Sequence, residues 1–236
     1  MDPKTYAKHW EKESTLFDSK GVYRRLSEIT PKENVLEIGS GIGLATLALA
    51  ASRKVLAVDS NVHLVELARS RLAAAGVTAE IVVADVFDPS SQSVETIKEF
   101  APKVIVGWFL GSNADDQDKY VASDVPVDER AKKYRENVED AMLVESICPP
   151  SVDWVHLATR CGVIADMTEA FVKQTTKADY DNHVFLPNGF EVVDVQILDW
   201  DTVGSGFSYG AAKNPNLLPG QLVAKLISVL AKRKTS

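Results

Sequence analysis

The chain has 236 residues, 45% hydrophobic and 25% charged, a globular composition that excludes a disordered tail, a collagen-like fibre and a disulfide-stapled miniprotein. Its net charge of −7 argues against a broad grip on a phosphate backbone, although a local basic groove stays open. Two cysteines, Cys148 and Cys161, indicate buried thiols in a reducing compartment.

The sequence shows no recognisable targeting signal. Its N-terminal segment is charged and aromatic where a signal peptide needs an apolar stretch. The longest apolar runs, such as residues 44–51, are far shorter than the ~20 residues of a membrane helix. We therefore expect a soluble, cytoplasmic protein with no membrane partner. No repeat or linker marks a domain boundary, so we expect one domain over residues 1–236.

Residues 1–30 are typical of an amphipathic helix that precedes the first strand. Aromatic residues alternate there with charges, namely Tyr6, Trp10, Phe17 and Tyr23. Such a series more often packs a helix than forms a substrate cage, so both interpretations are kept.

The next part of the chain alternates short apolar runs with helical stretches. A helix follows the first run over residues 44–52, and a second is capped by Asn61 and ends at Gly76. The apolar runs predict six strands, at residues 35–38, 55–58, 81–84, 104–106, 152–158 and 189–198. Apolar runs separated by helices favour a parallel sheet that is covered on both faces.

The chain departs from this alternation in two places. Residues 115–150 are strongly charged, with a predicted helix over residues 128–146, and such an insertion often covers a site. After a glycine-rich loop at residues 202–220, residues 222–230 favour an antiparallel strand over a terminal amphipathic helix. The predicted fold is α/β: a doubly wound, seven-stranded, mostly parallel sheet with an antiparallel last strand, a helical N-terminal segment and a helical insertion before strand five.

A glycine cluster lies where the first strand turns into the first helix. The stretch Glu37-Ile38-Gly39-Ser40-Gly41-Ile42-Gly43 lets the backbone approach a ligand, and the helix start offers free amides to a negative group. The dinucleotide pattern G-x-G-x-x-G needs its third glycine at position 44, which is a leucine. The form E-x-G-x-G-x-G instead resembles motif I of the class I S-adenosylmethionine-dependent methyltransferases.

Two further acids follow the same family pattern. Asp59 ends the second strand, 22 residues after Glu37, and Asp85 ends the third. A carboxylate at the end of strand two can accept hydrogen bonds from both ribose hydroxyls of a nucleoside. Any one of these acids alone is as well explained by a helix N-cap or a solvated strand end. The three acids behind one glycine loop favour a cofactor site.

The resemblance implies a methyltransferase with S-adenosylmethionine as cofactor. It implies that Glu37 orients the amino end of the methionine, that Asp85 accepts from the adenine amine, and that Val86 and Phe87 contact the ring. Trp108 could wall the sulfonium by cation–π contact, or could be a core aromatic. The cofactor-binding candidates are Glu37, Gly39, Ser40, Gly41, Gly43, Asp59, Ser60, Asp85, Val86 and Trp108.

The acceptor is less defined. After strand four, residues 107–113 lack the Asn/Asp-Pro-Pro-Tyr/Phe signature of many amino-methylating enzymes, which argues against methylation of a nucleobase or amide nitrogen. His156 is expected in the core, and neither His9 nor His183 stands out as a general base. No metal site is expected, and no catalytic residue is assigned. The substrate candidates are Tyr6, Trp10, Asn113, Phe207 and Tyr209.

The sequence therefore predicts transfer of a methyl group to N or O of a small-molecule acceptor beneath two cap segments, residues 1–30 and 115–150. The alternatives are a peptide or protein methyltransferase and a non-catalytic S-adenosylmethionine-binding partner subunit. No nucleic-acid partner is expected.

Overall fold

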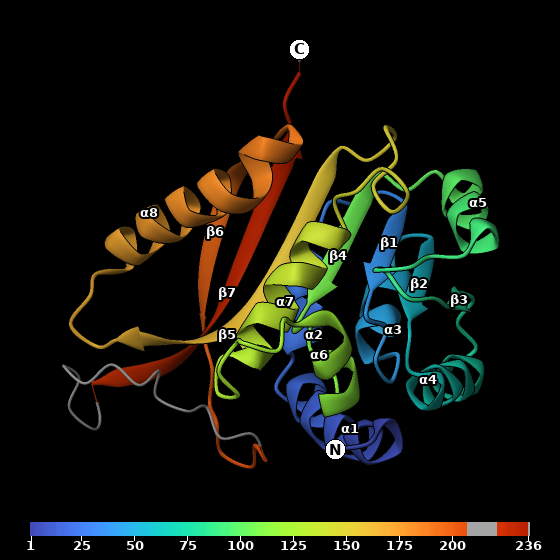
Figure 1. The fold of residues 1–236 in the computed structure, drawn as a ribbon, viewed down its shortest axis with the longest axis horizontal. Helices are drawn as coiled ribbons and strands as arrows, with labels where there is room; N and C mark the ends of the chain where they lie inside the picture. The colour runs from blue at the N-terminus through green and yellow to red at the C-terminus, as the bar shows by residue number, and fades with distance from the viewer. Residues whose placement is uncertain (207–220, 236) are drawn as a thin grey trace.

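A computed structural model describes residues 1–206 and 221–235. Its centre is a seven-stranded sheet with the order β3-β2-β1-β4-β5-β7-β6 (Figure 1). Strand β7 is antiparallel to both of its neighbours, and the other pairs are parallel. The strands are β1 (Val35–Ile38), β2 (Val55–Asp59), β3 (Glu80–Val83), β4 (Val104–Trp108), β5 (Trp154–Ile164), β6 (Phe190–Asp199) and β7 (Leu222–Arg233). The predicted fold class is confirmed, including a strand rather than a helix at the end of the chain.

Helices cover both faces of the sheet (Figure 1). Within each buried strand, successive side chains enter two different hydrophobic cores: Val35 belongs to the core that includes α1–α4, and Leu36 belongs to the core that includes α5, α7 and α8. This explains the apolar runs, because a strand covered on both faces buries every side chain. The helices are α1 (Pro3–Ser19), α2 (Val22–Ile29), α3 (Leu44–Ala50), α4 (Val62–Ala75), α5 (Ser91–Phe100), α6 (Ala114–Tyr120), α7 (Arg130–Ala141) and α8 (Glu169–Tyr180).

Local signals set the helix ends in the first half of the chain. The Asn61 side chain accepts the His63 N–H at 3.1 Å and caps α4, and Gly76 ends that helix at φ 66°, as predicted. The single helix expected over residues 1–30 is wrong. The chain breaks it into α1 and α2 at Gly21, whose φ of 70° suits glycine.

The second half differs more from the sequence-based expectation. β5 continues to Ile164, beyond the expected end at residue 158, because β7 pairs with it as far as Ile164 and Leu222. The expected helix over residues 128–146 is shorter, and α6 precedes it. α8 and the π-helical turn Asp181–Phe185 that continues it were not predicted. Within the described ranges, no helix combines the length and apolar character that a membrane crossing requires.

Candidate functional site

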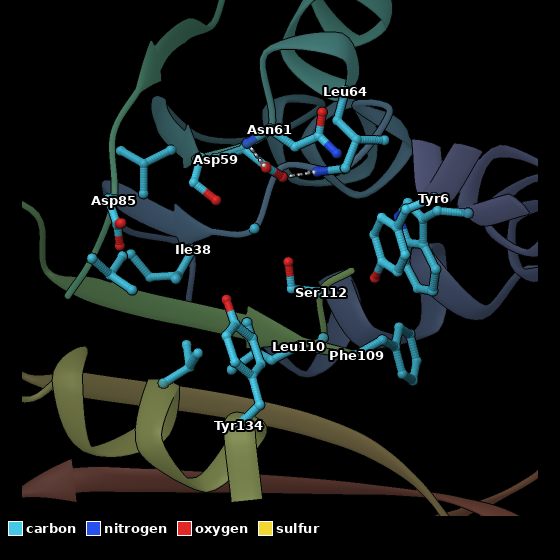
Figure 2. Close-up of a pocket in the computed structure, with 18 of the residues that line it drawn as sticks. Tyr6, Ile38, Asp59, Asn61, Leu64, Asp85, Phe109, Leu110, Ser112 and Tyr134 are labelled. Atoms are coloured by element: carbon cyan, nitrogen blue, oxygen red, sulfur yellow. Dashed lines mark hydrogen bonds between the residues drawn. The ribbon is translucent and has the colours of Figure 1, made fainter. Parts of the chain in front are cut away.

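A cleft with about 670 Å³ of empty space lies at the carboxyl ends of β1, β2, β3 and β4. This is the edge where parallel α/β sheets bind ligands. In Figure 2, Asp59 and Asp85 lie on one side of the cleft and Tyr6 lies on the opposite side. Tyr134 projects into it from α7 with its hydroxyl toward the cleft. Further lining residues include Trp10, Leu64 of α4, and residues 108–112 at and after the end of β4.

The glycine loop forms the floor of the cleft. Gly39 and Gly41, both of which line it, have φ angles of 79° and 51°, which side chains rarely adopt. A Cβ added to Gly41 would lie 2.5 Å from Nε1 of Trp10, so the indole of α1 packs on the bare backbone. Gly43 does not line the cleft. Its missing side chain lets the loop contact the Ala68 backbone of α4, 3.0 Å from where a Cβ would stand.

Asp59 joins the second strand to the glycine loop. Its carboxylate accepts the backbone N–H groups of Gly41 and Asn61, each at 2.9 Å, and lines the cleft (Figure 2). Burial raises the pKa of Asp59 to about 6, while the two N–H donors act in the opposite direction. The carboxylate is therefore fixed in place by the backbone, with lone pairs left for a ligand. Ser60, the next residue, also lines the cleft.

Glu37 lies behind the glycine loop rather than in the cleft lining. Its side chain is buried, and the Thr46 hydroxyl donates to it at 2.6 Å. Burial raises the pKa of Glu37 to about 8, and the nearby charge of Asp59 adds to the rise. The hydroxyl of Ser40 is likewise buried outside the cleft lining. Glu37 therefore touches α3, and its predicted contact with the methionine end stays a prediction.

Asp85 closes the other end of the cleft with α6. It lines the cleft together with Val86, and the Tyr120 hydroxyl donates to its carboxylate. Lys119 forms an ion pair with the same carboxylate at 3.5 Å. Phe87 turns away from the cleft lining and stacks on Tyr120 with the ring centroids 4.1 Å apart. The Phe87 ring therefore packs against α6 and not in the cleft, where the resemblance implies a contact with the adenine ring.

Two aromatic residues at the end of β4 separate the cleft from the core. Trp108 is 5% exposed, and its ring stacks on Tyr23 with His156 at its edge. Phe109 follows at φ 57°, a left-handed conformation that costs free energy for a residue with a side chain. Its N–H donates to the Ala158 carbonyl at 2.8 Å, which fixes this conformation.

The acceptor candidates separate into three groups. Tyr6 and Trp10 line the cleft. Asn113 does not: its buried side chain accepts the N–H groups of Asp115 and Asp116 and caps α6. Phe207 and Tyr209 lie outside the described residues.

His156 is a core histidine, as expected. Its ring nitrogens bind the hydroxyls of Thr30 and Ser228 at 2.7 and 2.8 Å. Burial lowers its pKa to about 3, so it stays neutral at physiological pH.

Sequence reasoning expected residues 115–150 to cover the site but did not single out any residue of α7. Tyr134 and Val138 line the cleft, one helical turn apart. Their i, i+4 spacing, continued by Met142, is an apolar stripe in a charged segment, and this signal could have identified the buried face.

Comparison with known proteins matches residues 35–101 to the family model of a methyltransferase domain. A TehB-like SAM-dependent methyltransferase from Corynebacterium glutamicum has a similar structure, with 13% identity, a TM-score of 0.50 and coverage of 98% of this chain and 99% of that chain. TrmN from Thermus thermophilus has 13% identity and a TM-score of 0.50, with coverage of 90% of this chain and 48% of that chain. No match was found among curated proteins.

The sheet order and the glycine loop, with acids after successive strands, define a Rossmann-like methyltransferase fold. Residues 35–101, from β1 to α5, match the model of a methyltransferase domain, and the whole chain has the fold of the class I S-adenosylmethionine-dependent methyltransferases. It is an enzyme, and S-adenosylmethionine is its cofactor.

The expectation that excluded nucleic acid from the partners is wrong. TrmN, whose fold this chain shares, is an RNA methyltransferase, so the fold also accommodates nucleic-acid acceptors. Since this likeness concerns the fold alone, it does not determine the acceptor. The sequence-based exclusion failed because it rested on net charge and a missing tetrapeptide, and neither describes the local surface beside the cleft.

Proposed function

We propose that the protein transfers a methyl group to a nitrogen or oxygen atom of a small acceptor that enters the cleft beside Tyr6. This proposal rests on the helices that cover the cleft. Tyr6 and Trp10 of α1 and Tyr134 of α7 line the cleft beyond the edge of the sheet. Residues 1–30 and 115–150 would act as cap segments of one methyltransferase domain spanning residues 1–236. We also propose that the protein acts in the cytoplasm.

The residues of the cleft fit S-adenosylmethionine. Gly39 and Gly41 hold the backbone in conformations that leave the floor without side chains, and the Asp59 carboxylate keeps free lone pairs beside it. Asp59 would accept the ribose hydroxyls, and Asp85 and Val86 would contact the adenine. When bound, this cofactor supplies an electrophilic methyl group on a sulfonium sulfur.

The chain's own part in the reaction is to align the acceptor and to exclude water. α1 is anchored over the cleft by Asn61, whose side-chain amide donates to the Pro3 carbonyl at 3.0 Å. Burial raises the pKa values of Tyr6 and Tyr134 above the usual range of a phenol. Both hydroxyls therefore stay protonated at neutral pH and can orient an acceptor by hydrogen bonds. Alignment and desolvation supply much of the rate in such a displacement.

Two measurements test this proposal. Calorimetric titration should show binding of S-adenosylmethionine and S-adenosylhomocysteine, and no binding of NAD. S-adenosylhomocysteine formation is then followed with separate pools of small hydroxy and amino compounds, peptides and RNA. Turnover with a small compound supports the proposal. Turnover confined to peptides or RNA would overturn the acceptor class, and binding without turnover in any pool would support a non-catalytic partner subunit.

A further inference from the structure

A second hollow, which we call the basic pocket, adjoins the cofactor cleft. It contains about 760 Å³ of empty space and shares Tyr6 and residues 109–112 with the cleft. Its outer wall comes from α6, α7 and β5 and carries three cationic side chains, those of Lys132, Arg135 and Arg160. None of the described residues that line it is an aspartate or glutamate.

The carboxylates that pair with these cations lie outside the lining of the basic pocket. Arg135 binds the buried Glu139 through Nε at 3.3 Å, and Arg160 binds the buried Glu13 through Nη1 at 3.3 Å. Each carboxylate therefore contacts its arginine on the side that faces the protein interior and not on the side that faces the pocket. An arginine has five N–H donors in a planar fork, so Arg135 can bind a ligand while it keeps its contact with Glu139.

Both arginines are held in place before any ligand arrives. Nη1 of Arg135 also donates to the Thr159 hydroxyl of β5 at 3.1 Å. The guanidinium of Arg160 lies over the rings of Trp10 and Phe17, at 5.8 and 5.6 Å from their centroids. Their side chains are only 26% and 19% exposed. Arginines fixed on a helix and a strand bind planar anions with little loss of entropy.

The shared wall connects anion binding to methyl transfer. Residues 109–112 line both hollows, and Tyr6 has its hydroxyl 3.6 Å from where a Cβ of Gly111 would stand. A ligand anchored at Arg135 would extend past this wall toward the cleft. Arg135 is also incompletely neutralised near neutral pH, because burial raises the pKa of Glu139 to about 7.

We propose that the basic pocket is the acceptor subsite and that the acceptor carries a carboxylate or phosphate group, which Arg135 binds while Arg160 contributes positive charge to the pocket wall. This inference rests on the proposed function of the adjoining cleft. Arg160 also anchors α1 through Glu13, so Arg135 is the residue to test. Lys132 adds a third positive charge at the rim, where its side chain is 71% exposed.

The test uses the whole 236-residue chain saturated with S-adenosylhomocysteine. Inorganic phosphate, benzoate and the uncharged benzamide are titrated separately while the arginine Nε–H signals are followed by NMR. We expect both anions to shift the Arg135 signal and benzamide to leave it unchanged. Tighter binding of phosphate than benzoate would identify a phosphate-bearing acceptor, and the reverse would identify a carboxylate.

Variants decide whether the arginine is responsible. Arg135→Gln should weaken anion binding at least tenfold. Lys133→Gln is the matched control for Lys132→Gln, because both lysines pair with Glu136, at 3.5 and 3.6 Å, but only Lys132 lines the basic pocket. We expect Lys132→Gln to weaken anion binding and Lys133→Gln to change it less than twofold.

Several results would overturn the proposal. These are no response to either anion, an equal response to benzamide, or unchanged anion affinity in Arg135→Gln. If that variant misfolds because Glu139 loses its partner, the double variant Arg135→Gln with Glu139→Gln replaces it. Cofactor affinity is measured in parallel. If the wild-type protein does not bind the cofactor, the proposed function is refuted. If it binds the cofactor but does not respond to either anion, only the acceptor subsite is refuted.

Discussion

Asp59 should contribute to cofactor affinity far more than to stability. In Asp59→Ala the cleft loses the carboxylate that would accept the ribose hydroxyls. Hydrogen bonds to a charged group contribute about 1.5–3 kcal/mol, which corresponds to about a 10- to 160-fold weaker dissociation constant. The fixed position of this carboxylate, held by the Gly41 and Asn61 N–H groups at 2.9 Å each, supports the upper part of that range.

The same two hydrogen bonds set the expected cost to stability. The variant leaves two backbone N–H groups without their acceptor, but it also removes a carboxylate whose burial raises its pKa to about 6. The two effects oppose each other. We therefore expect the free energy of unfolding to fall by about 1–2 kcal/mol, and the melting temperature to fall by about 2–8 °C.

Calorimetric titration with S-adenosylhomocysteine and thermal denaturation of the same samples measure both quantities. Asp59→Asn keeps one acceptor oxygen and should fall between the wild type and Asp59→Ala. Glu80→Ala is the control. This exposed carboxylate is at the start of β3, at the amino-terminal ends of the strands and so at the opposite end from the cleft. Unchanged affinity in Asp59→Ala, together with a melting temperature lowered by more than about 10 °C, would show that Asp59 only supports the backbone.

Two further variants test the surroundings of this carboxylate. The pKa of Glu37 is raised from 4.5 to about 8, so the native state keeps a proton that the unfolded chain releases, and stability falls as pH rises across this interval. Glu37→Gln should therefore raise the melting temperature relative to wild type more at pH 8.5 than at pH 5, as calorimetry at the two pH values would show. Gly41→Ala should lower stability by more than Gly76→Ala, because both have positive φ but only the first would press a Cβ against Trp10, while nothing lies within 4 Å at Gly76. Thermal denaturation compares them, and equal losses would refute the role of the Trp10 contact.

The first half of the fold could be predicted because its signals are local. The glycine loop, the Asn61 cap and the Gly76 stop each act within a few residues, and β1 and β2 are buried on both faces except for Asp59 at the end of β2. A parallel sheet then brings the carboxyl ends of its strands to one edge without further information. The positions of Asp59 and Asp85 in the cleft follow from that geometry.

The side-chain directions could not be predicted in the same way. Glu37 is part of the same motif, but its carboxylate faces Thr46 of α3 and not the cleft. Asn113 follows a strand as Asp59 does, yet its amide caps α6. In each case the helix that follows the strand supplies a hydrogen-bond partner for the side chain. Residue type and spacing alone do not show whether the side chain binds that partner or points into the cleft.

The acceptor side depends on contacts between distant parts of the chain. Glu13 of α1 binds Arg160 of β5 and the Ser205 hydroxyl, the latter at 2.7 Å. Phe17 of the same helix stacks on Phe109 with the ring centroids 4.4 Å apart. The shared wall between the cleft and the basic pocket is thus positioned by α1, which is the first element of the chain, and by β5, which follows the insertion. Because these segments meet only in the folded sheet, the sequence could indicate the cofactor but not the chemistry of the acceptor, and substitutions in α1 and α7 should alter acceptor choice without altering the cofactor.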